Sequence, residues 1–292
     1  MKMKYIPLAV EKKLYIQYLE MCTHRTKSLN TEKRSDNIIV SLTSYPARFK
    51  YLYLVIESIF RQTLKPDRII LFLDEGVREE NLPSNLLELK KYGLEIEIGG
   101  APIKPHKKYY YAIKDNPDSV VITVDDDHVY RRDVVEKLIN SYHQFPKAVS
   151  CMRAHRITFD ANKKVMKYNE WEYECTDYIN QPRMDLIATG IGAVLYPPKC
   201  MYKDIFDLDC IMRLSLDADD IWLKVMEVLN QTPVVAVEAK KVNPIAVDSI
   251  DVSPLAAQNV NESKNDVYLQ NLVKKYGIDL YELISKSDSV NK

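Results

Sequence analysis

The chain has 292 residues, of which 46% are hydrophobic and 28% are charged, so it can bury the core of an ordinary globular protein. Its 41 basic and 41 acidic side chains cancel, which excludes a general attraction to nucleic acid, so any basic site must be local. The five scattered cysteines form no Cys-x-x-Cys pair and are typical of reduced thiols. No run approaches the roughly 20 apolar residues of a membrane span, so we expect a cytoplasmic protein.

Residues 1–36 are expected to form an N-terminal helix and a loop. Apolar side chains recur at helical spacing over residues 8–22, which predicts an amphipathic helix that packs on the core. Lys12 and Lys13 lie beside this apolar stripe. The alternative is therefore that the helix makes peripheral contact with the inner face of a membrane.

Strands and helices alternate in the next part of the chain. Apolar and β-branched runs predict strands, and helical spacing predicts the helices between them. The expected strands are 37–42, 68–73, 94–98 and 119–124, and the expected helices are 51–62, 86–92 and 106–115. This alternation with short connections predicts an α/β fold, with a mostly parallel central sheet flanked by helices.

The pattern becomes less regular after residue 130. The expected elements are a helix over 134–142, a strand over 148–154, an insertion or hairpin over 158–183, a glycine-containing segment over 188–196, a helix over 217–229, a strand over 234–237 and a helix over 266–276. We therefore expect an N-terminal segment, a main domain over 37–250 and a C-terminal tail with a helix over 251–292. The main domain divides into halves at residues 37–130 and 131–250.

Three consecutive aspartates, Asp125, Asp126 and Asp127, follow the strand over 119–124. Ligands bind beyond the carboxyl ends of parallel strands, and adjacent carboxylates repel one another unless a cation is present. Mg²⁺ or Mn²⁺ prefers such oxygen ligands, together with phosphate and water. The alternative is a solvated acidic loop or a helix N-cap cluster with Asp133. Candidate cations for a bound diphosphate are Arg48, Lys104, His106, Lys107, Lys108, Arg131 and Arg132. We expect His106 and His128 to be surface residues rather than ligands.

Four stretches in order resemble a known class of enzyme. They are V-S-L-T-S-Y-P-A-R-F, I-E-S-I-F-R-Q-T-L-K-P-D-R-I-I-L-F-L-D, V-I-T-V-D-D-D, and A-T-G-I-G-A-V-L-Y followed by L-D-A-D-D-I-W. Together they resemble nucleotide-sugar glycosyltransferases of the Rossmann-like GT-A fold, and in particular the bacterial family-2-like enzymes of capsule and lipopolysaccharide assembly. The third stretch matches their D-x-D motif, and the likeness covers roughly residues 37–247.

This resemblance implies a donor site with Mn²⁺ or Mg²⁺ as cofactor. Asp127 matches the carboxylate that coordinates the metal; Asp125 matches the first aspartate of the motif, which contacts the nucleoside or joins the metal, and Asp126 assists. The other implied nucleotide-sugar-binding residues are Thr43, Tyr45, Pro46 and Arg48 in the base-binding loop, Asp74 near the nucleoside, and Lys107 or Lys108 facing the diphosphate. Tyr45 would stack on the base. Many relatives add a late histidine to the metal, but no histidine follows His155 here.

The second acidic cluster matches the region that supplies the catalytic base in inverting relatives. Asp219 is the first choice for this base and Asp220 the second, although the usual Glu-Asp pair is replaced here. The alternative is a helix N-cap, with Asp217 capping and Asp220 in the first turn. Gly190 and Gly192 would let the backbone approach the donor or acceptor sugar, or would simply form a tight turn.

The expected activity is transfer of a sugar, from a UDP-linked donor in first place, to a hydroxyl of a glycan in bacterial surface polysaccharide synthesis. The acceptor can be lipid-linked, and inversion is preferred over retention. A haloacid-dehalogenase-type phosphatase is disfavoured because the sequence has no Gly-Asp dipeptide. A nucleotidyltransferase is a weaker alternative because S-L-T-S-Y-P-A-R lacks glycine. A non-catalytic nucleotide-sugar-binding module is the other alternative.

Overall fold

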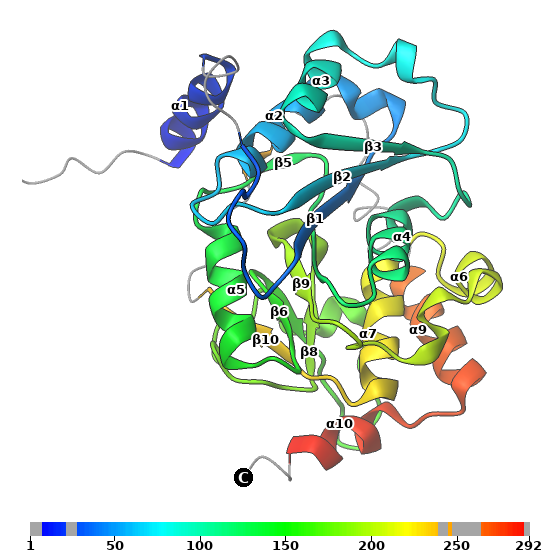
Figure 1. Ribbon diagram of the computed structural model, residues 1–292. Coiled ribbons are helices and arrows are strands. Elements are labelled where there is room, and N and C mark those ends of the chain that lie inside the picture. The colour runs from blue at the N-terminus through cyan, green and yellow to red at the C-terminus, as the bar shows by residue number, and fades with distance from the viewer. Residues whose placement is uncertain (1–7, 22–27, 239–244, 247–263, 289–292) are drawn as a thin grey trace, which may run out of the picture.

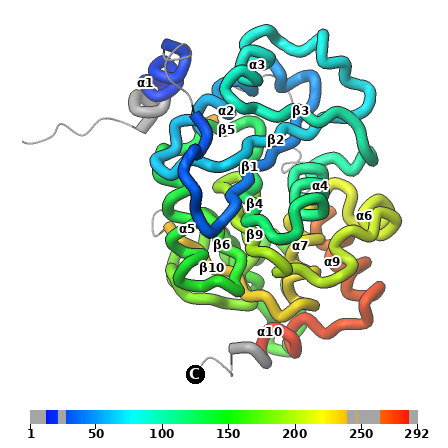
Figure 2. The backbone as a smooth tube through the Cα atoms, in the orientation of Figure 1, coloured from blue at the N-terminus to red at the C-terminus, as the bar shows by residue number. Residues whose placement is uncertain are grey.

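A seven-stranded sheet forms the centre of the molecule, with helices on both faces (Figures 1 and 2). The computed structural model describes residues 8–21, 28–238, 245–246 and 264–288. The sheet order is β10-β6-β9-β4-β1-β2-β3. Its strands are β1 (Ile38–Thr43), β2 (Arg68–Leu73), β3 (Leu94–Ile98), β4 (Val120–Thr123), β6 (Val149–Cys151), β9 (Val194–Tyr196) and β10 (Val234–Ala236). Two small sheets pair β5 (His128–Val129) with β11 (Ile245–Ala246), and β7 (Ala154–Arg156) with β8 (Leu186–Ala188).

The central sheet is mostly parallel, as the sequence predicts. Strand β1 pairs in parallel with β2 and β4, β2 pairs in parallel with β3, and β6 with β10. Strand β9 is antiparallel to both of its neighbours, β4 and β6. The carboxyl ends of β1, β2, β4 and β6 therefore meet at one rim of the sheet, and the amino end of β9 meets them there.

The helices cover the sheet because successive side chains of a strand point to opposite faces. Ile38, Val40 and Leu42 of β1 pack in one core with α2 and α5, whereas Ile39 packs on the other face with Ala112 of α4. The helices are α1 (Leu8–Met21), α2 (Phe49–Phe60), α3 (Ser84–Glu88), α4 (Lys107–Asp115), α5 (Val134–Gln144), α6 (Leu208–Leu214), α7 (Asp219–Asn230), α9 (Lys264–Tyr276) and α10 (Leu280–Asp288).

The sequence-based elements agree well with the first half of the chain and less well with the second. The predicted bounds of β2 and β3 are those observed. The strand expected over 148–154 is divided into β6 and the start of β7, and α6, α10 and the pairing of β5 with β11 were not predicted. The segment expected to be an insertion over 158–183 makes short antiparallel bridges: Glu172 pairs with Arg156 of β7, and Phe159 pairs with Val165.

The C-terminal helices belong to the second core of the molecule. Leu269 and Leu272 of α9 and Ile284 of α10 are buried with Trp222 of α7, against the side of the sheet that contains Val194 of β9. Figure 1 shows α7 and α9 side by side, in keeping with their direct packing. In the described ranges, no helix has both the length and the apolar character needed to cross a bilayer.

Candidate functional site

The rim at the carboxyl ends of the strands collects the polar residues that the sequence analysis selected. The three aspartates follow β4, the turn over residues 44–48 follows the adjacent β1, which ends at Thr43, and Asp74 follows β2. Gly190 and Gly192 precede β9, which enters the sheet at the same rim because it runs antiparallel. The start of α7 brings the second acidic cluster to this rim, since Asp219 forms an ion pair with the same lysine as Asp125.

Cations neutralise the middle and last aspartates of the triplet. Nη1 of Arg48 lies 2.7 Å from Oδ1 of Asp126 and 2.6 Å from Oδ2 of Asp127, and Ser44 donates its hydroxyl to Asp126 at 2.6 Å. His128 is also in close contact with Asp127. The Asp126 side chain is only 10% exposed, so the middle of the triplet is not solvated. The triplet is not at the N-cap either, because Asp133 occupies that position of α5, six residues after Asp127, and makes no side-chain cap hydrogen bond.

The adjacent carboxylates Asp126 and Asp127 differ in their affinity for protons. Burial raises the pKa of Asp126 in spite of its contacts with Arg48 and Ser44. Burial also acts to raise the pKa of Asp127, but His128 and Arg48 outweigh it and lower this pKa to about 2. Asp127 is therefore firmly anionic, and 31% of its side chain is exposed.

Lys108 joins the two acidic clusters. Its Nζ lies 2.8 Å from Oδ1 of Asp125 and 2.9 Å from Oδ2 of Asp219. Burial would lower the pKa of Lys108, but the charges of Asp125 and Asp219 raise it well above its ordinary value, so the side chain is cationic. One buried ammonium thus holds together a carboxylate of the D-x-D motif and a carboxylate that lies 94 residues later in the chain.

The start of α7 separates the proton affinities of two adjacent carboxylates. Burial acts to raise the pKa of Asp219, but Lys108 holds it below its ordinary value. Burial and the charge of Asp219 raise the pKa of Asp220 well above the ordinary range, although Lys108 and the backbone N–H of Gly190 oppose this. Asp219 therefore binds a proton less tightly than Asp220 does.

The N-cap alternative for the second cluster is also wrong. Helix α7 begins at Asp219, and its N-cap is Ala218, so no side chain caps the helix. Asp217 instead accepts hydrogen bonds from Nζ of Lys104 at 2.6 Å and from the hydroxyl of Tyr268 at 3.1 Å. Its contacts tie the α6–α7 connection to α9 rather than to the first turn of α7.

The two glycines allow close packing at the centre of the rim. A β-carbon at Gly190 would lie 2.8 Å from Nζ of Lys108 and 3.1 Å from Oδ1 of Asp125, so a side chain there would displace the ion pair. A β-carbon at Gly192 would lie 3.1 Å from the β-carbon of Arg153. Gly190 thus brings its backbone against the two groups that the sequence predicts for the donor.

Lys107 and Lys108 are neighbours with different partners. Both were predicted to be candidates for the diphosphate, yet Lys107 donates to Asp74 at 2.6 Å and to the carbonyl of Gly99 at 2.9 Å. It is fully buried at the ends of β2 and β3. Lys108 alone lies at the aspartate triplet, with Asp125 as its partner.

The predicted base-binding loop is fixed by its own hydrogen bonds. Thr43 donates its hydroxyl to the carbonyl of Phe72 at 2.9 Å, and Nε of Arg48 donates to the Tyr45 hydroxyl at 3.0 Å. Tyr45 is partly exposed. The loop therefore orients Arg48 toward the aspartates and holds Tyr45 beside it.

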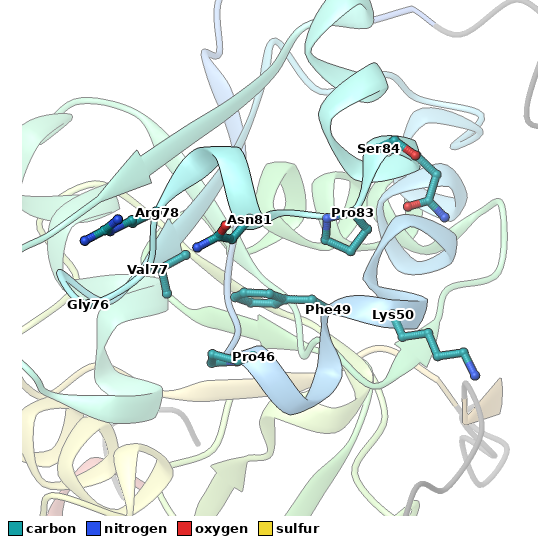
Figure 3. A pocket seen from close by; sticks show the side chains of 10 residues that line it. Pro46, Phe49, Lys50, Gly76, Val77, Arg78, Asn81, Pro83 and Ser84 are labelled. Carbon is teal, nitrogen blue, oxygen red and sulfur yellow. The ribbon is translucent and has the colours of Figure 1, made fainter.

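A cavity of about 730 Å³ lies next to this loop. Its lining residues are Pro46, Phe49, Lys50, Gly76, Val77, Arg78, Asn81, Pro83, Ser84 and Asn85. Figure 3 shows the Phe49 ring between Pro46 and Val77, at the junction of α2 with the segment that follows β2. The cavity shares Pro46 with the predicted base-binding loop, and none of the aspartates of the triplet lines it.

Sequence reasoning missed how residues 104–108 hold residues 215–219. His106 is fully buried, so its expected surface position is wrong. Its Nε2 donates to the carbonyl of Ser215 at 2.8 Å, which leaves Nδ1 to accept from the Tyr109 hydroxyl at 2.9 Å. Lys104 forms an ion pair with Asp217, and Lys108 forms one with Asp219. Together with His106, every second residue of 104–108 therefore contacts one residue of 215–219. The pattern K-P-H-K-K gives no sign of partners so far along the chain.

Comparison with known proteins identifies the family to which this chain belongs. The sequence model described as "Glycosyl transferase family 2" matches residues 39–201, which is more than half of the chain. The chain belongs to glycosyl transferase family 2. It is accordingly a nucleotide-sugar glycosyltransferase with a GT-A arrangement of its sheet, as the sequence resemblance predicts. No curated protein sequence matches the chain significantly.

Solved structures of similar architecture include two enzymes. One is the mannosyltransferase PcManGT from Pyrobaculum calidifontis in complex with GDP-Man and Mn²⁺, with a TM-score of 0.44 and 10% identity over 97% of this chain and 88% of that chain. The other is 4-diphosphocytidyl-2C-methyl-D-erythritol synthase, with a TM-score of 0.43 and 8% identity over 80% of this chain and 100% of that chain. At these scores neither likeness carries an argument about the activity of this protein.

Proposed function

We propose that the protein transfers a sugar from a UDP-linked donor to a hydroxyl of a glycan in bacterial surface polysaccharide synthesis, with inversion at the anomeric carbon. The observation that carries this proposal is the position of Lys108 between Asp125 and Asp219. It supports the proposal because a carboxylate of the D-x-D motif and the carboxylate proposed as the base share one cation. In this proposal residues 37–130 bind the nucleotide and residues 131–250 bind the acceptor.

A hard divalent cation, Mg²⁺ or Mn²⁺, fits the carboxylates of the triplet. Among the described residues, no three His, Cys, Asp or Glu side chains are grouped to hold a metal by themselves. Such cations commonly take only one or two protein carboxylates and complete their shell with phosphate and water. Asp125 and Asp127 are 28% and 31% exposed, so both offer oxygen atoms to a ligand at the rim. When bound there, the metal would stabilise the negative charge of the departing diphosphate.

Asp219 is the proposed catalytic base. Lys108 lowers its pKa and so favours its ionised form, whereas burial and the charge of Asp219 favour the protonated form of Asp220. Two neighbouring carboxyls with separated pKa values are the usual arrangement for acid–base chemistry. Asp219 would take the proton of the acceptor hydroxyl while the oxygen of that hydroxyl forms the new bond to the anomeric carbon. The bond from that carbon to the diphosphate breaks on the opposite face, which inverts the configuration.

The nucleoside is proposed to lie over β1 and β2. Thr43, Tyr45 and Pro46 would face it from the β1 loop, and Asp74 from the end of β2. Arg48 and Lys108 already form ion pairs with carboxylates of the triplet, so each could shift toward an incoming diphosphate. Their cationic state supports an anionic donor at this rim.

A lipid-linked acceptor and peripheral contact with the inner face of the membrane complete the proposal. Leu14, Tyr18 and Met21 of α1 are exposed apolar residues at helical spacing. This stripe supports a cytoplasmic enzyme that meets its acceptor at a membrane surface.

Calorimetric titration of UDP, GDP and CMP with and without Mn²⁺ tests the donor site. We expect metal-dependent binding of UDP to the wild-type protein and its loss in Asp127→Asn. Metal-dependent binding of GDP in place of UDP would keep the enzyme class and change the donor. Absence of metal-dependent binding for all three nucleotides would overturn the donor site.

A further inference from the structure

A partly exposed aromatic ring lies on the opposite side of the aspartates from the predicted base-binding loop. Tyr173 is 38% exposed, and its ring packs on the buried His155, with centroids 4.3 Å apart and planes at 37°. Tyr168 meets it edge-on at 5.8 Å and 84°. An aromatic ring that is supported by other rings and still reaches solvent is a suitable surface for stacking.

Glu174 holds a backbone conformation that side chains rarely adopt. Its φ is +50°, a region that is unfavourable for residues other than glycine. The backbone N–H of Glu174 donates to Nδ1 of His155 at 2.9 Å, and its carboxylate lies 3.0 Å from Nη2 of Arg153. These contacts fix the direction of the carboxylate beside the Tyr173 ring.

Arg153 has hydrogen-bonding capacity beyond its pair with Glu174. Its side chain is 18% exposed, and its buried Nε has no hydrogen-bond partner among the described residues. Arg153 follows β6 and lies against Gly192, and its carbonyl accepts from the backbone N–H of Thr189 at 3.1 Å. Thr189 directly precedes Gly190, whose backbone packs on Lys108 and Asp125. The group is therefore continuous with the catalytic rim.

The sheet order separates this group from the donor. Strand β4 carries the aspartates, β1 and β2 lie on one side of it, and β9 and β6 lie on the other. The predicted base-binding loop follows β1, whereas Arg153 follows β6. A transferase needs its two substrates on opposite sides of the reacting centre, and this group occupies the side left free by the donor.

The chemistry of the group favours an uncharged, hydroxyl-rich ligand. Arg153 and Glu174 cancel each other's charge. Burial and the charge of Arg153 lower the pKa of His155 to about 3, so the support under Tyr173 is neutral at physiological pH. A paired guanidinium and carboxylate offer donors and acceptors side by side, which suits the hydroxyl groups of a sugar.

We propose that Tyr173, Glu174 and Arg153 form the subsite for the terminal sugar of the acceptor, a neutral pyranose. One face of the sugar ring stacks on Tyr173, and its hydroxyl groups form hydrogen bonds with Glu174 and Arg153. This subsite rests on the proposed function for its role in transfer, but its ability to bind a sugar can be tested without turnover.

Saturation-transfer NMR on the full chain tests the subsite with three probes: methyl β-D-glucopyranoside, methyl β-D-galactopyranoside and methyl α-D-mannopyranoside. At least one is expected to receive magnetisation at its ring C–H protons. Tyr173→Ala is expected to weaken its binding about tenfold, which corresponds to about 1.4 kcal/mol. Tyr173→Phe should retain stacking, and Tyr92→Ala, which removes a partly buried ring from the donor half, should bind as the wild type does.

The same titrations of UDP with Mn²⁺ separate this inference from the proposed function. Tyr173→Ala is expected to bind nucleotide like the wild type, which also shows that the variant folds. If the wild-type protein bound no nucleotide, the donor site would be overturned. The subsite would then be tested by glycoside binding alone. The subsite is overturned if no glycoside receives magnetisation, or if Tyr173→Ala binds the glycoside as tightly as the wild type does.

Discussion

The two acidic clusters of this enzyme use burial in opposite ways. In the triplet, Asp125 and Asp127 reach the surface and are paired with cations that a ligand can rearrange. In the second cluster Asp219 is buried, and its negative charge raises the pKa of the adjacent Asp220. Exposed, paired carboxylates suit the binding of a cation, whereas buried, coupled carboxylates suit the transfer of a proton. Lys108 belongs to both clusters, so a change at this residue affects both.

The largest expected effect concerns the proton transfer. Asp219→Asn removes the ionised carboxylate, so the kcat for sugar transfer is expected to fall by about 10²- to 10⁴-fold, the usual contribution of a general base. Asp220→Asn is the matched control, because the raised pKa of Asp220 favours its protonated form, which an amide resembles. Steady-state kinetics with the donor that calorimetry identifies measures both variants. A larger loss in Asp220→Asn than in Asp219→Asn would transfer the role of base to Asp220.

Removing the shared cation is expected to destabilise the protein strongly. Lys108→Met leaves Asp125 and Asp219 without their buried partner, and loss of one member of a buried pair typically costs about 3–5 kcal/mol. Lys107→Met is the matched control on the same helix, because its carboxylate partner Asp74 is largely exposed and can be hydrated. Urea unfolding measures the free energy of unfolding of both variants. Equal losses would show that Lys108 is not a special link between the clusters.

The arrangement of the two acidic clusters was only partly predictable from the sequence. The strand ending in the triplet was evident, because an apolar run stops abruptly at charged residues. The distant partners of Lys108 and His106, Asp219 and Ser215, were not, since ion pairs and hydrogen bonds to residues more than 100 positions away leave no local periodicity. The same limit applies to β5 and β11, two-residue strands that exist only through their pairing. Long, regular elements such as β2 carry their own signal.

The next largest effect is the pH dependence of the contributions that the adjacent Asp127 and Asp126 make to the free energy of unfolding. The folded-state pKa of Asp127 is about 2, below the unfolded value near 4, so its stabilising contribution is full above pH 4 and is lost as the pH falls toward 2. In the metal-free protein we expect this contribution to be about 1–2 kcal/mol and to be absent from Asp127→Asn. Urea unfolding between pH 5 and pH 2 measures it; a pH-independent difference between the two proteins would contradict the prediction.

Asp126→Asn should have the opposite dependence on pH. Because burial raises the folded-state pKa of Asp126, its contribution is full below the unfolded value and is lost as the pH rises through the folded value. The wild-type protein should therefore lose stability relative to Asp126→Asn as the pH rises. Parallel curves for the two variants would mean that the two carboxylates have the same environment.

The smallest effect is expected at the outermost of the three contacts between residues 104–108 and 215–219. Lys104 is 50% exposed, so its ion pair with Asp217 is hydrated and screened by salt. Lys104→Gln should lower the free energy of unfolding by at most about 1 kcal/mol, and the difference should shrink in high salt. His106 and Lys108 would still hold Ser215 and Asp219, so the start of α7 should stay in place. A loss in Lys104→Gln as large as that in Lys108→Met would instead mean that the Asp217 contact, and not the buried lysine, fixes the second acidic cluster against the first.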